Sequence, residues 1–294
     1  MSHGSGDREG NGMAWGAISF VNAIPMGIGA SAAISLNCRS RVEIRKKPDG
    51  GTLEVAVNGE PSSEFLQMVA GMTLGRLDEG TNWSLSVHLG STIPLGKGLK
   101  SSSAVSVSLA RAIADAFGMA LAPVDLARIS AQCARDSGIS VTGAFDDAIT
   151  SASGGVTVAD AKAFQVLLET GLPKGLQAVL WLPSGTHPPP SEIRQRFRGS
   201  EERAREAARL AREGSLFPAM ALNTALVEEA LGYDYQELHE VGHLLGALAS
   251  GVSGNGPALA YIIPRPLTEG LRKALKGRSG EAMVTDFVEG GPSL

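Results

Sequence analysis

Alternating hydrophobic and polar positions predict strands in the first third of the chain. Apolar side chains recur at every second residue over 34–38 and again over 53–57, which is the period of a strand with one buried face. The sequence PDGG at 48–51 separates the two runs and is typical of a turn. We therefore expect an antiparallel hairpin from these segments, followed by another strand over 83–89, where the alternation is strict.

Longer apolar spacings predict helices between and after these strands. The pattern over 64–77 fits a helix better than a strand. Small residues, length and a terminal glycine predict a second helix, which follows three serines at 101–103 and ends near 117–118. A third helix is expected over 123–136, and 142–155 combines a loop, a helix and a glycine break before a short strand.

The second half of the chain mixes strands and helices, which predicts an α+β arrangement. The expected strands lie over 178–183, at the end of 253–263 and over 282–289, and the expected helices lie over 191–213, 215–231, 235–250 and 267–276. We expect two domains, a first lobe over 13–165 and a second lobe over 166–294. Residues 1–12 are polar and glycine-rich without periodicity, so we expect them to form a disordered extension.

Composition and charge narrow the classes of partner. The 294 residues are 43% hydrophobic and 19% charged, which is typical of a globular protein, and the formal net charge of −4 gives no general attraction to nucleic acid or to anionic lipid. Cys38 and Cys133 are too few for a disulfide framework or a metal knuckle. We find neither a membrane span nor an export signal in the sequence, and we expect a cytoplasmic protein.

The most informative segment for chemistry is 94–104, PLGKGLKSSSA. Glycines let the backbone curve, and backbone N–H groups at the start of a helix attract phosphate. This is a phosphate-binding loop in outline, although a glycine-rich turn with a serine N-cap would give a similar string. It is not a Walker A loop, because Gly98 rather than serine or threonine follows Gly96 and Lys97.

The same segment resembles the second motif of the GHMP kinases. Two further segments occur in the order that this family requires: 142–155 resembles the region of the catalytic aspartate, and 251–262 resembles the third, glycine-rich motif. Segment 20–36 occupies the position of the first motif and is similar to the archaeal shikimate kinases, as are the lysine-containing loop and TGAFDDA. The resemblance spans essentially Met13 to the C-terminus.

This resemblance implies a two-lobe α/β (α+β) fold, with an N-terminal lobe like domain 2 of ribosomal protein S5 and a ferredoxin-like C-terminal lobe. It implies the cofactors ATP and Mg²⁺, with shikimate as the small-molecule substrate. The residues implied to bind ATP are Pro94, Leu95, Gly96, Lys97, Gly98, Leu99, Lys100, Ser101, Ser102, Ser103 and Ala104. Ser101 or Ser102 would hold the metal.

The catalytic acid is implied to be Asp146 or Asp147, and one motif spacing favours each, so both stay open. A pair of acids that caps a helix is the alternative reading of these residues. Several GHMP kinases place a lysine in the first motif, near the catalytic acid. None occurs over 13–38, so the assisting cation is also open.

A carboxylate on the substrate calls for a cation, ideally a bidentate arginine. The candidates are Arg135, Arg39, Arg41 and the cluster of Arg194, Arg196 and Arg198. Asn22 and Thr142 are expected to contact the substrate or to cap the local backbone, and Gly254, Asn255 and Gly256 belong to the third motif. His187, His239 and His243 are assigned no chemistry. The rivals are another GHMP kinase, for homoserine, mevalonate or a sugar, and a metabolite sensor without turnover; a homodimer is possible.

Overall fold

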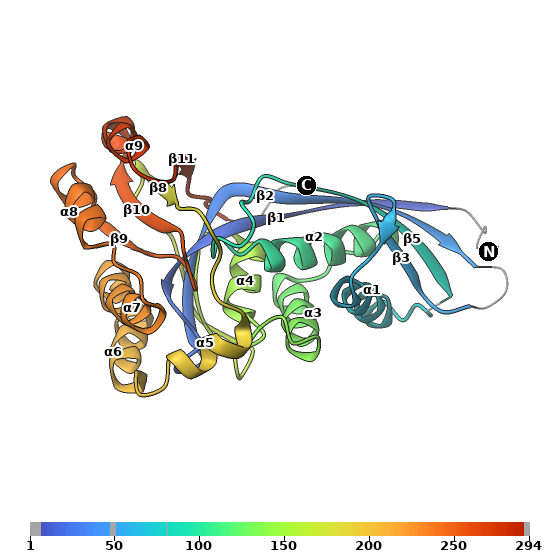
Figure 1. Ribbon diagram of the computed structural model, residues 1–294. Coiled ribbons are helices and arrows are strands. Elements are labelled where there is room, and N and C mark those ends of the chain that lie inside the picture. The colour runs from blue at the N-terminus through green and yellow to red at the C-terminus, as the bar shows by residue number, and fades with distance from the viewer. Residues whose placement is uncertain (1–6, 48–50, 81, 291–294) are drawn as a thin grey trace.

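The computed structural model describes residues 7–47, 51–80 and 82–290, which form two lobes, each built on its own sheet (Figure 1). The first lobe contains strands β1 (Arg8–Val21), β2 (Ile28–Lys46), β3 (Glu54–Val57), β4 (Glu60–Pro61), β5 (Trp83–Ser91), β6 (Val156–Asp160) and β7 (Gln165–Thr170). Its helices are α1 (Glu64–Arg76), α2 (Ser101–Ala116), α3 (Pro123–Asp136) and α4 (Phe145–Ser153). The helices predicted in this lobe are therefore present.

The long strand β2 organises the first sheet. It pairs antiparallel with β1 along one side, and with β6 and then β5 along the other. Strand β3 pairs parallel with β5, not with β2. The predicted hairpin of 34–38 with 53–57 is therefore wrong, because alternation indicates a strand but does not name its partner, and β5 lies between the two segments.

The start of the chain also differs from the prediction. Residues 8–12 belong to β1 rather than to a disordered extension; residues 1–6 lie outside the described residues. Gly10 and Gly12 let this strand approach α2, because a Cβ at either position would lie 2.1 Å from a helix carbonyl oxygen, that of Ala112 or of Ser108. A glycine-rich composition is typical of disordered segments, but these two glycines are needed for close packing of the strand against the helix.

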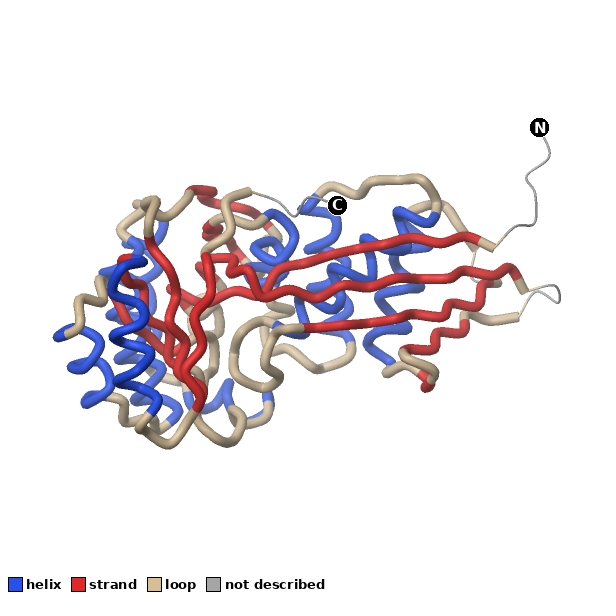
Figure 2. The backbone as a smooth tube through the Cα atoms, turned by 90° about the horizontal axis from the view of Figure 1, so that it is seen from above, coloured by secondary structure: helices blue, strands red, loops and turns tan. Residues whose placement is uncertain are grey.

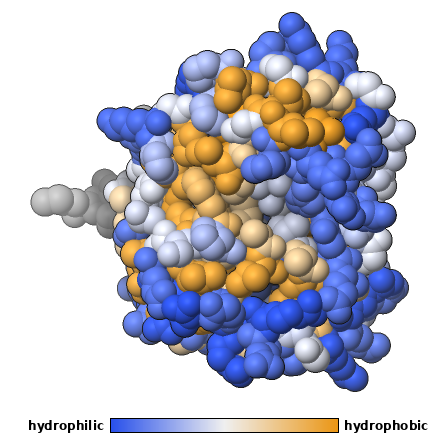
Figure 3. Space-filling view, turned by 90° about the vertical axis from the view of Figure 1, so that its left-hand side faces the viewer, coloured by the Kyte–Doolittle hydropathy of each residue, from blue (hydrophilic) through white to orange (hydrophobic). Residues whose placement is uncertain are grey.

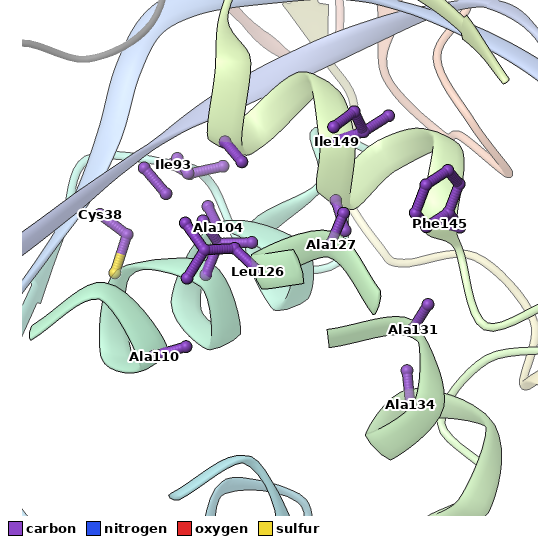
Figure 4. Close-up of a cluster of buried hydrophobic side chains, with 14 of the residues drawn as sticks. Cys38, Ile93, Ala104, Ala110, Leu126, Ala127, Ala131, Ala134, Phe145 and Ile149 are labelled. Atoms are coloured by element: carbon purple, nitrogen blue, oxygen red, sulfur yellow. The ribbon is translucent and has the colours of Figure 1, made fainter. Parts of the chain in front are cut away.

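The helices of the first lobe cover one face of its sheet, and Figure 2 shows the strands from the opposite side. Side chains of α2, α3 and α4 meet in the core, where Ala104, Leu126 and Phe145 are fully buried (Figure 4). Burial of a side chain such as Phe145 contributes about 1.5–3 kcal/mol. A hydroxyl pair, Ser106 Oγ to Ser130 Oγ at 2.7 Å, also joins α2 to α3. The first turns of α2 and α4 are thus held on a rigid base.

The second lobe has a four-stranded sheet in the order β11-β8-β10-β9. Its strands are β8 (Leu176–Leu182), β9 (Ala249–Val252), β10 (Leu259–Pro264) and β11 (Glu281–Asp286); its helices are α5 (Pro190–Arg196), α6 (Glu201–Arg212), α7 (Leu216–Leu231), α8 (Gln236–Leu244) and α9 (Thr268–Lys276), with a 3₁₀ turn at Arg265–Leu267. The helix predicted over 191–213 is interrupted near Gly199, where φ is +84°. The helix predicted over 235–250 ends early, because β9 begins at Ala249.

The first sheet continues through β7 to Thr170, five residues beyond the expected boundary at 165, and β7 was not predicted.

The outer end of the second lobe, near α7 and α8, exposes apolar side chains around a hollow (Figure 3). Leu244 and Leu248 are 81% and 52% exposed. In the described part of the chain, no helix has the length and apolar character needed to cross a membrane.

Candidate active site

A cavity opens where the loop before α2, the loop after β1 and the loop before β10 come together between the lobes. The predicted site residues that line this cavity are Asn22, Gly96, Gly98, Lys100, Ser101, Ser102, Ser103, Thr142, Asp146, Asp147, Gly254 and Asn255. They come from four segments that are far apart in sequence. The first, second and third motifs and the region of the two aspartates therefore converge on one site.

Other predicted residues lie elsewhere. Leu99 and Ala104 are buried in the core, and Leu95 is 73% exposed; neither these residues nor Pro94, Lys97 and Gly256 line the cavity. The backbones of these residues shape the loops. A contiguous motif does not distinguish residues that shape a loop from residues that contact a ligand.

None of the arginines proposed to bind the carboxylate lines the cavity. Arg135 is exposed on α3 and stacks over the ring of Phe164, 4.8 Å from its centroid. Arg39 and Arg41 line a separate groove on the sheet with His88. Arg135 was a candidate because of its guanidinium group, and that chemistry does not specify which side of α3 the residue occupies.

The phosphate loop is held tightly by the second lobe. Ser253 Oγ donates a hydrogen bond of 2.9 Å to the carbonyl oxygen of Gly98. Gly98 has φ of +78°, and a Cβ on it would lie 2.0 Å from the carbonyl oxygen of Ser253. Lys100 is also in the left-handed region, with φ of +66°, and α2 begins at the next residue. This geometry turns the N-terminus of α2, and the hydroxyls of Ser101 and Ser102, toward the cavity.

Gly98→Ala is expected to displace the loop, because the added Cβ would meet backbone and because alanine is strained at positive φ. We expect the free energy of unfolding to fall by about 1–3 kcal/mol and nucleotide binding to weaken. Urea unfolding and calorimetric titration with ATP would measure the two effects. Gly90→Ala is the matched control, since a Cβ there meets nothing within 4 Å; equal behaviour of the two variants would contradict this account.

Asn22 joins the two lobes. Its Nδ2 donates to the carbonyl oxygen of Gly254 at 3.1 Å and to Asn255 Oδ1 at 2.8 Å, and its Oδ1 accepts from the backbone N–H of Ile24 at 2.9 Å. Both N–H groups of the amide are thus used within the protein, so Asn22 orients the third motif. Thr142 Oγ1 accepts from the N–H of Ala144 at 3.2 Å, which is the local cap weighed from the sequence, and Thr142 also lines the cavity.

The two acids of the site differ in environment. Asp147 Oδ1 lies 2.9 Å from Lys100 Nζ and accepts a hydrogen bond of 3.3 Å from Ser31 Oγ. Only 8% of the Lys100 side chain and 16% of the Asp147 side chain are exposed, so this is a largely desolvated ion pair. Lys100 therefore supplies a cation beside the acids, in the absence of a lysine in the first motif.

Asp146 is buried, with 4% of the residue exposed, and its Oδ1 has no hydrogen-bond partner among the described residues. Burial, and next the negative charge of Asp147, raise the pKa of Asp146 to about 8, while Lys100 acts in the opposite direction. An unpartnered buried carboxylate oxygen is costly, and here it belongs to a residue that lines the cavity. Asp146 is thus a residue of the cavity lining whose carboxyl group favours its protonated form.

Several lining residues were missed by the sequence analysis. Phe65, Ala134 and Ile139 form apolar wall, and Ser130 and Ser140 add hydroxyl groups. His187 reaches the cavity from the segment between β8 and α5, and Pro190 reaches it from the first position of α5. No motif marks these residues, because they come from helix faces and a connecting segment that only the fold brings together.

The residues present fit Mg²⁺ bound with a nucleotide, which usually needs one or two protein oxygens besides phosphate and water. Ser101 and Ser102 lie in the first turn of α2, and both line the same cavity as Asp147. Within the described ranges, no group of three or more histidine, cysteine or acidic residues is placed to hold a metal ion.

Comparison with known proteins gives consistent results. A model of the N-terminal domain of GHMP kinases matches residues 67–155. The chain is 32% identical over 250 residues to the shikimate kinase of Thermococcus kodakarensis, covering 85% of this chain and 90% of that protein. It is 30% identical over 288 residues to the shikimate kinase of Methanocella arvoryzae, covering 97% and 96%.

Solved structures share the architecture at low identity. The mevalonate kinase of Methanococcus jannaschii superposes with a TM-score of 0.70 at 12% identity, over 98% of this chain and all (100%) of that one. The galactokinase of Lactococcus lactis, solved with galactose, superposes with a TM-score of 0.71 at 12% identity, over 97% and 95%. These likenesses confirm the two-lobe α/β fold predicted from the motifs.

Proposed function

Since this chain belongs to the GHMP kinase family, we propose that it transfers the γ-phosphoryl group of ATP to the 3-hydroxyl of shikimate, giving 3-phosphoshikimate and ADP. The observation that carries the proposal is the position of Asp146. Asp146 lines a cavity that also contains the serine-lined N-terminus of α2 and the ion pair of Lys100 with Asp147. A kinase needs an acceptor for the hydroxyl proton beside a phosphate-binding loop.

In this mechanism the backbone N–H groups at the start of α2 bind the phosphates, and the apolar wall around Phe65 and Ile139 receives the base of the nucleotide. Asp146, in its ionised form, accepts the proton of the attacking hydroxyl. Lys100 neutralises negative charge beside the acids. Mg²⁺, when bound with ATP through Ser101 or Ser102, supplies further charge neutralisation on the phosphates. Positioning and charge neutralisation do most of the work in phosphoryl transfer.

The identity of the acceptor is supported by the relatives. Two proteins described as shikimate kinases align with most of this chain at 30% and 32% identity, whereas the mevalonate kinase and galactokinase structures are 12% identical. Fold alone does not determine substrate, so the solved structures carry no argument for the acceptor. The proposal for shikimate rests on the sequence relatives.

A coupled assay of ADP release tests the proposal. Purified protein with Mg-ATP is offered shikimate, homoserine, mevalonate and galactose in turn, and Asp146→Asn protein serves as the control for contaminating kinases. We expect ADP release that depends on shikimate. Release with another acceptor would contradict shikimate as the substrate and retain the kinase chemistry, whereas no release with any acceptor would favour a metabolite sensor.

A further inference from the structure

We infer that His187 recognises the carboxylate of the acceptor, and that Lys97 acts as a positioning residue by holding the segment that carries His187. This inference rests on the proposed function, since it concerns how the same site selects an anionic acceptor. It also assigns a role to His187, for which the sequence analysis predicted no chemistry. Lys97, which the family resemblance placed among the residues that bind ATP, receives a different role.

The cavity contains few groups that can carry a positive charge. Lys100 and His187 are the only residues of this kind among its described lining residues. Lys100 is already paired with Asp147 at 2.9 Å and lies next to the phosphate loop. Its charge is therefore committed to the acids and to phosphate. His187 is the remaining group that can bind a carboxylate by a charge-assisted hydrogen bond.

The segment that carries His187 is anchored to the phosphate loop. Lys97 Nζ donates to the carbonyl oxygen of Gly185 at 2.6 Å and also to that of Pro183. Beside it, a Cβ on Gly96 would lie 2.6 Å from Thr186 Cγ2, so the two segments are in close contact. Lys97 does not line the cavity. Its ammonium group thus fixes the wall of the cavity rather than contacting the phosphates in this arrangement.

The other end of the segment is also fixed, near the loop after β1. Residues 188–190 are three consecutive prolines, which restrict the backbone. The third proline begins α5, and Ile193 of this helix and Phe197 just after it belong to a buried cluster against which Ile24 packs. Ile24 and Asn22 line the same cavity. His187 is therefore held between the phosphate loop and the residues that follow β1, which is a suitable place to read the acceptor.

The hydrogen bonding of the ring leaves one nitrogen available. His187 Nδ1 lies 2.8 Å from the carbonyl oxygen of Pro188, and because a carbonyl oxygen only accepts, Nδ1 must donate. The other nitrogen, Nε2, has no protein partner among the described residues. In the protonated ring, Nε2–H can donate to a carboxylate oxygen.

The test compares shikimate with its neutral primary carboxamide as acceptors. In His187→Gln we expect KM for shikimate to rise about 10- to 100-fold, the range for loss of a hydrogen bond to a charged group, with kcat and KM for ATP within about 3-fold. The preference for shikimate over the carboxamide, as a ratio of kcat/KM values, should fall at least tenfold. A merely structural role for His187 would lower kcat/KM for shikimate and kcat/KM for the carboxamide together, and would leave their ratio unchanged.

Three further variants complete the design. Lys97→Met should also raise KM for shikimate. Lys97→Arg should raise it less than Lys97→Met does, because a guanidinium group can also donate to the two carbonyl oxygens. His243→Gln, on the exposed end of α8, is the matched control and should resemble wild type. An unchanged acid-to-amide ratio in His187→Gln would overturn the inference while the kinase assignment stands; absence of shikimate turnover in wild type would overturn both.

Discussion

Asp146→Asn is expected to lower turnover by about 10²–10⁴-fold, the usual contribution of a general base. The amide keeps the shape of the carboxylate but cannot take the proton of the acceptor hydroxyl. In wild type, only the ionised form of Asp146 can act as base, and its pKa is raised to about 8. The rate of the wild-type protein should therefore rise with pH through this range, and steady-state assays between pH 6 and 9 would measure it.

The same substitution should stabilise the protein. Between the ordinary aspartate pKa of about 4 and the raised value of about 8, folded Asp146 keeps its proton while the unfolded chain loses it. The folded state then binds more protons, so wild-type stability falls as pH rises across this interval. Asparagine does not ionise, and the advantage of Asp146→Asn in free energy of unfolding should be larger at pH 8 than at pH 5.

Asp147→Asn distinguishes the two acids. Because the charge of Asp147 contributes to the raised pKa of Asp146, its removal should shift the rising limb of the pH–rate profile to lower pH while retaining measurable turnover. If instead Asp147→Asn were inactive and Asp146→Asn were active, the roles proposed for the two carboxylates would be reversed.

Lys100→Met is the second substitution with a large expected effect. It removes the only lysine that lines the cavity in the described structure and leaves Asp147 without its partner at 2.9 Å. Breaking a buried ion pair from one side destabilises by about 3–5 kcal/mol, and we expect a value near the lower end because Asp147 retains some exposure. Turnover should fall about 10²–10³-fold, as for loss of one electrostatic contact to the transition state.

A double variant separates these two effects. Lys100→Met with Asp147→Asn removes both charges, so urea unfolding should recover much of the lost stability. Turnover should stay low, because no cation has been returned to the site. Recovery of turnover together with stability would show that Lys100 serves only to balance Asp147.

Local patterns were sufficient to predict much of this molecule. The small residues of α2 and the glycine after it predicted the helix, the three serines of its first turn indicated the phosphate loop, and the order of the motifs predicted the two lobes. These features depend on neighbours in sequence. A motif also preserves spacing, so the convergence of Asp146 and Gly254 on one cavity followed from the family resemblance.

The remainder depended on contacts between distant segments. The pairing of β2 with β5 is decided by the whole sheet, and alternation over 34–38 could not indicate it. Lys100 meets Asp147 only because its backbone adopts positive φ at the start of α2. Arg135 was misplaced because its position on α3 directs it toward Phe164. His187 lacks any motif, since it reaches the cavity through a connection between elements.

The hydrogen bond from Ser253 to Gly98 spans 155 positions of the chain. During synthesis on a ribosome, which proceeds from the N-terminus at about 5–20 residues per second, the loop at 96–100 emerges well before the residues that brace it. A nascent chain ending near Thr170 would contain the strands of the first sheet but would lack Ser253, whose hydrogen bond holds the loop at 96–100. The nucleotide site proposed above can therefore be completed only after residue 253 has been synthesised.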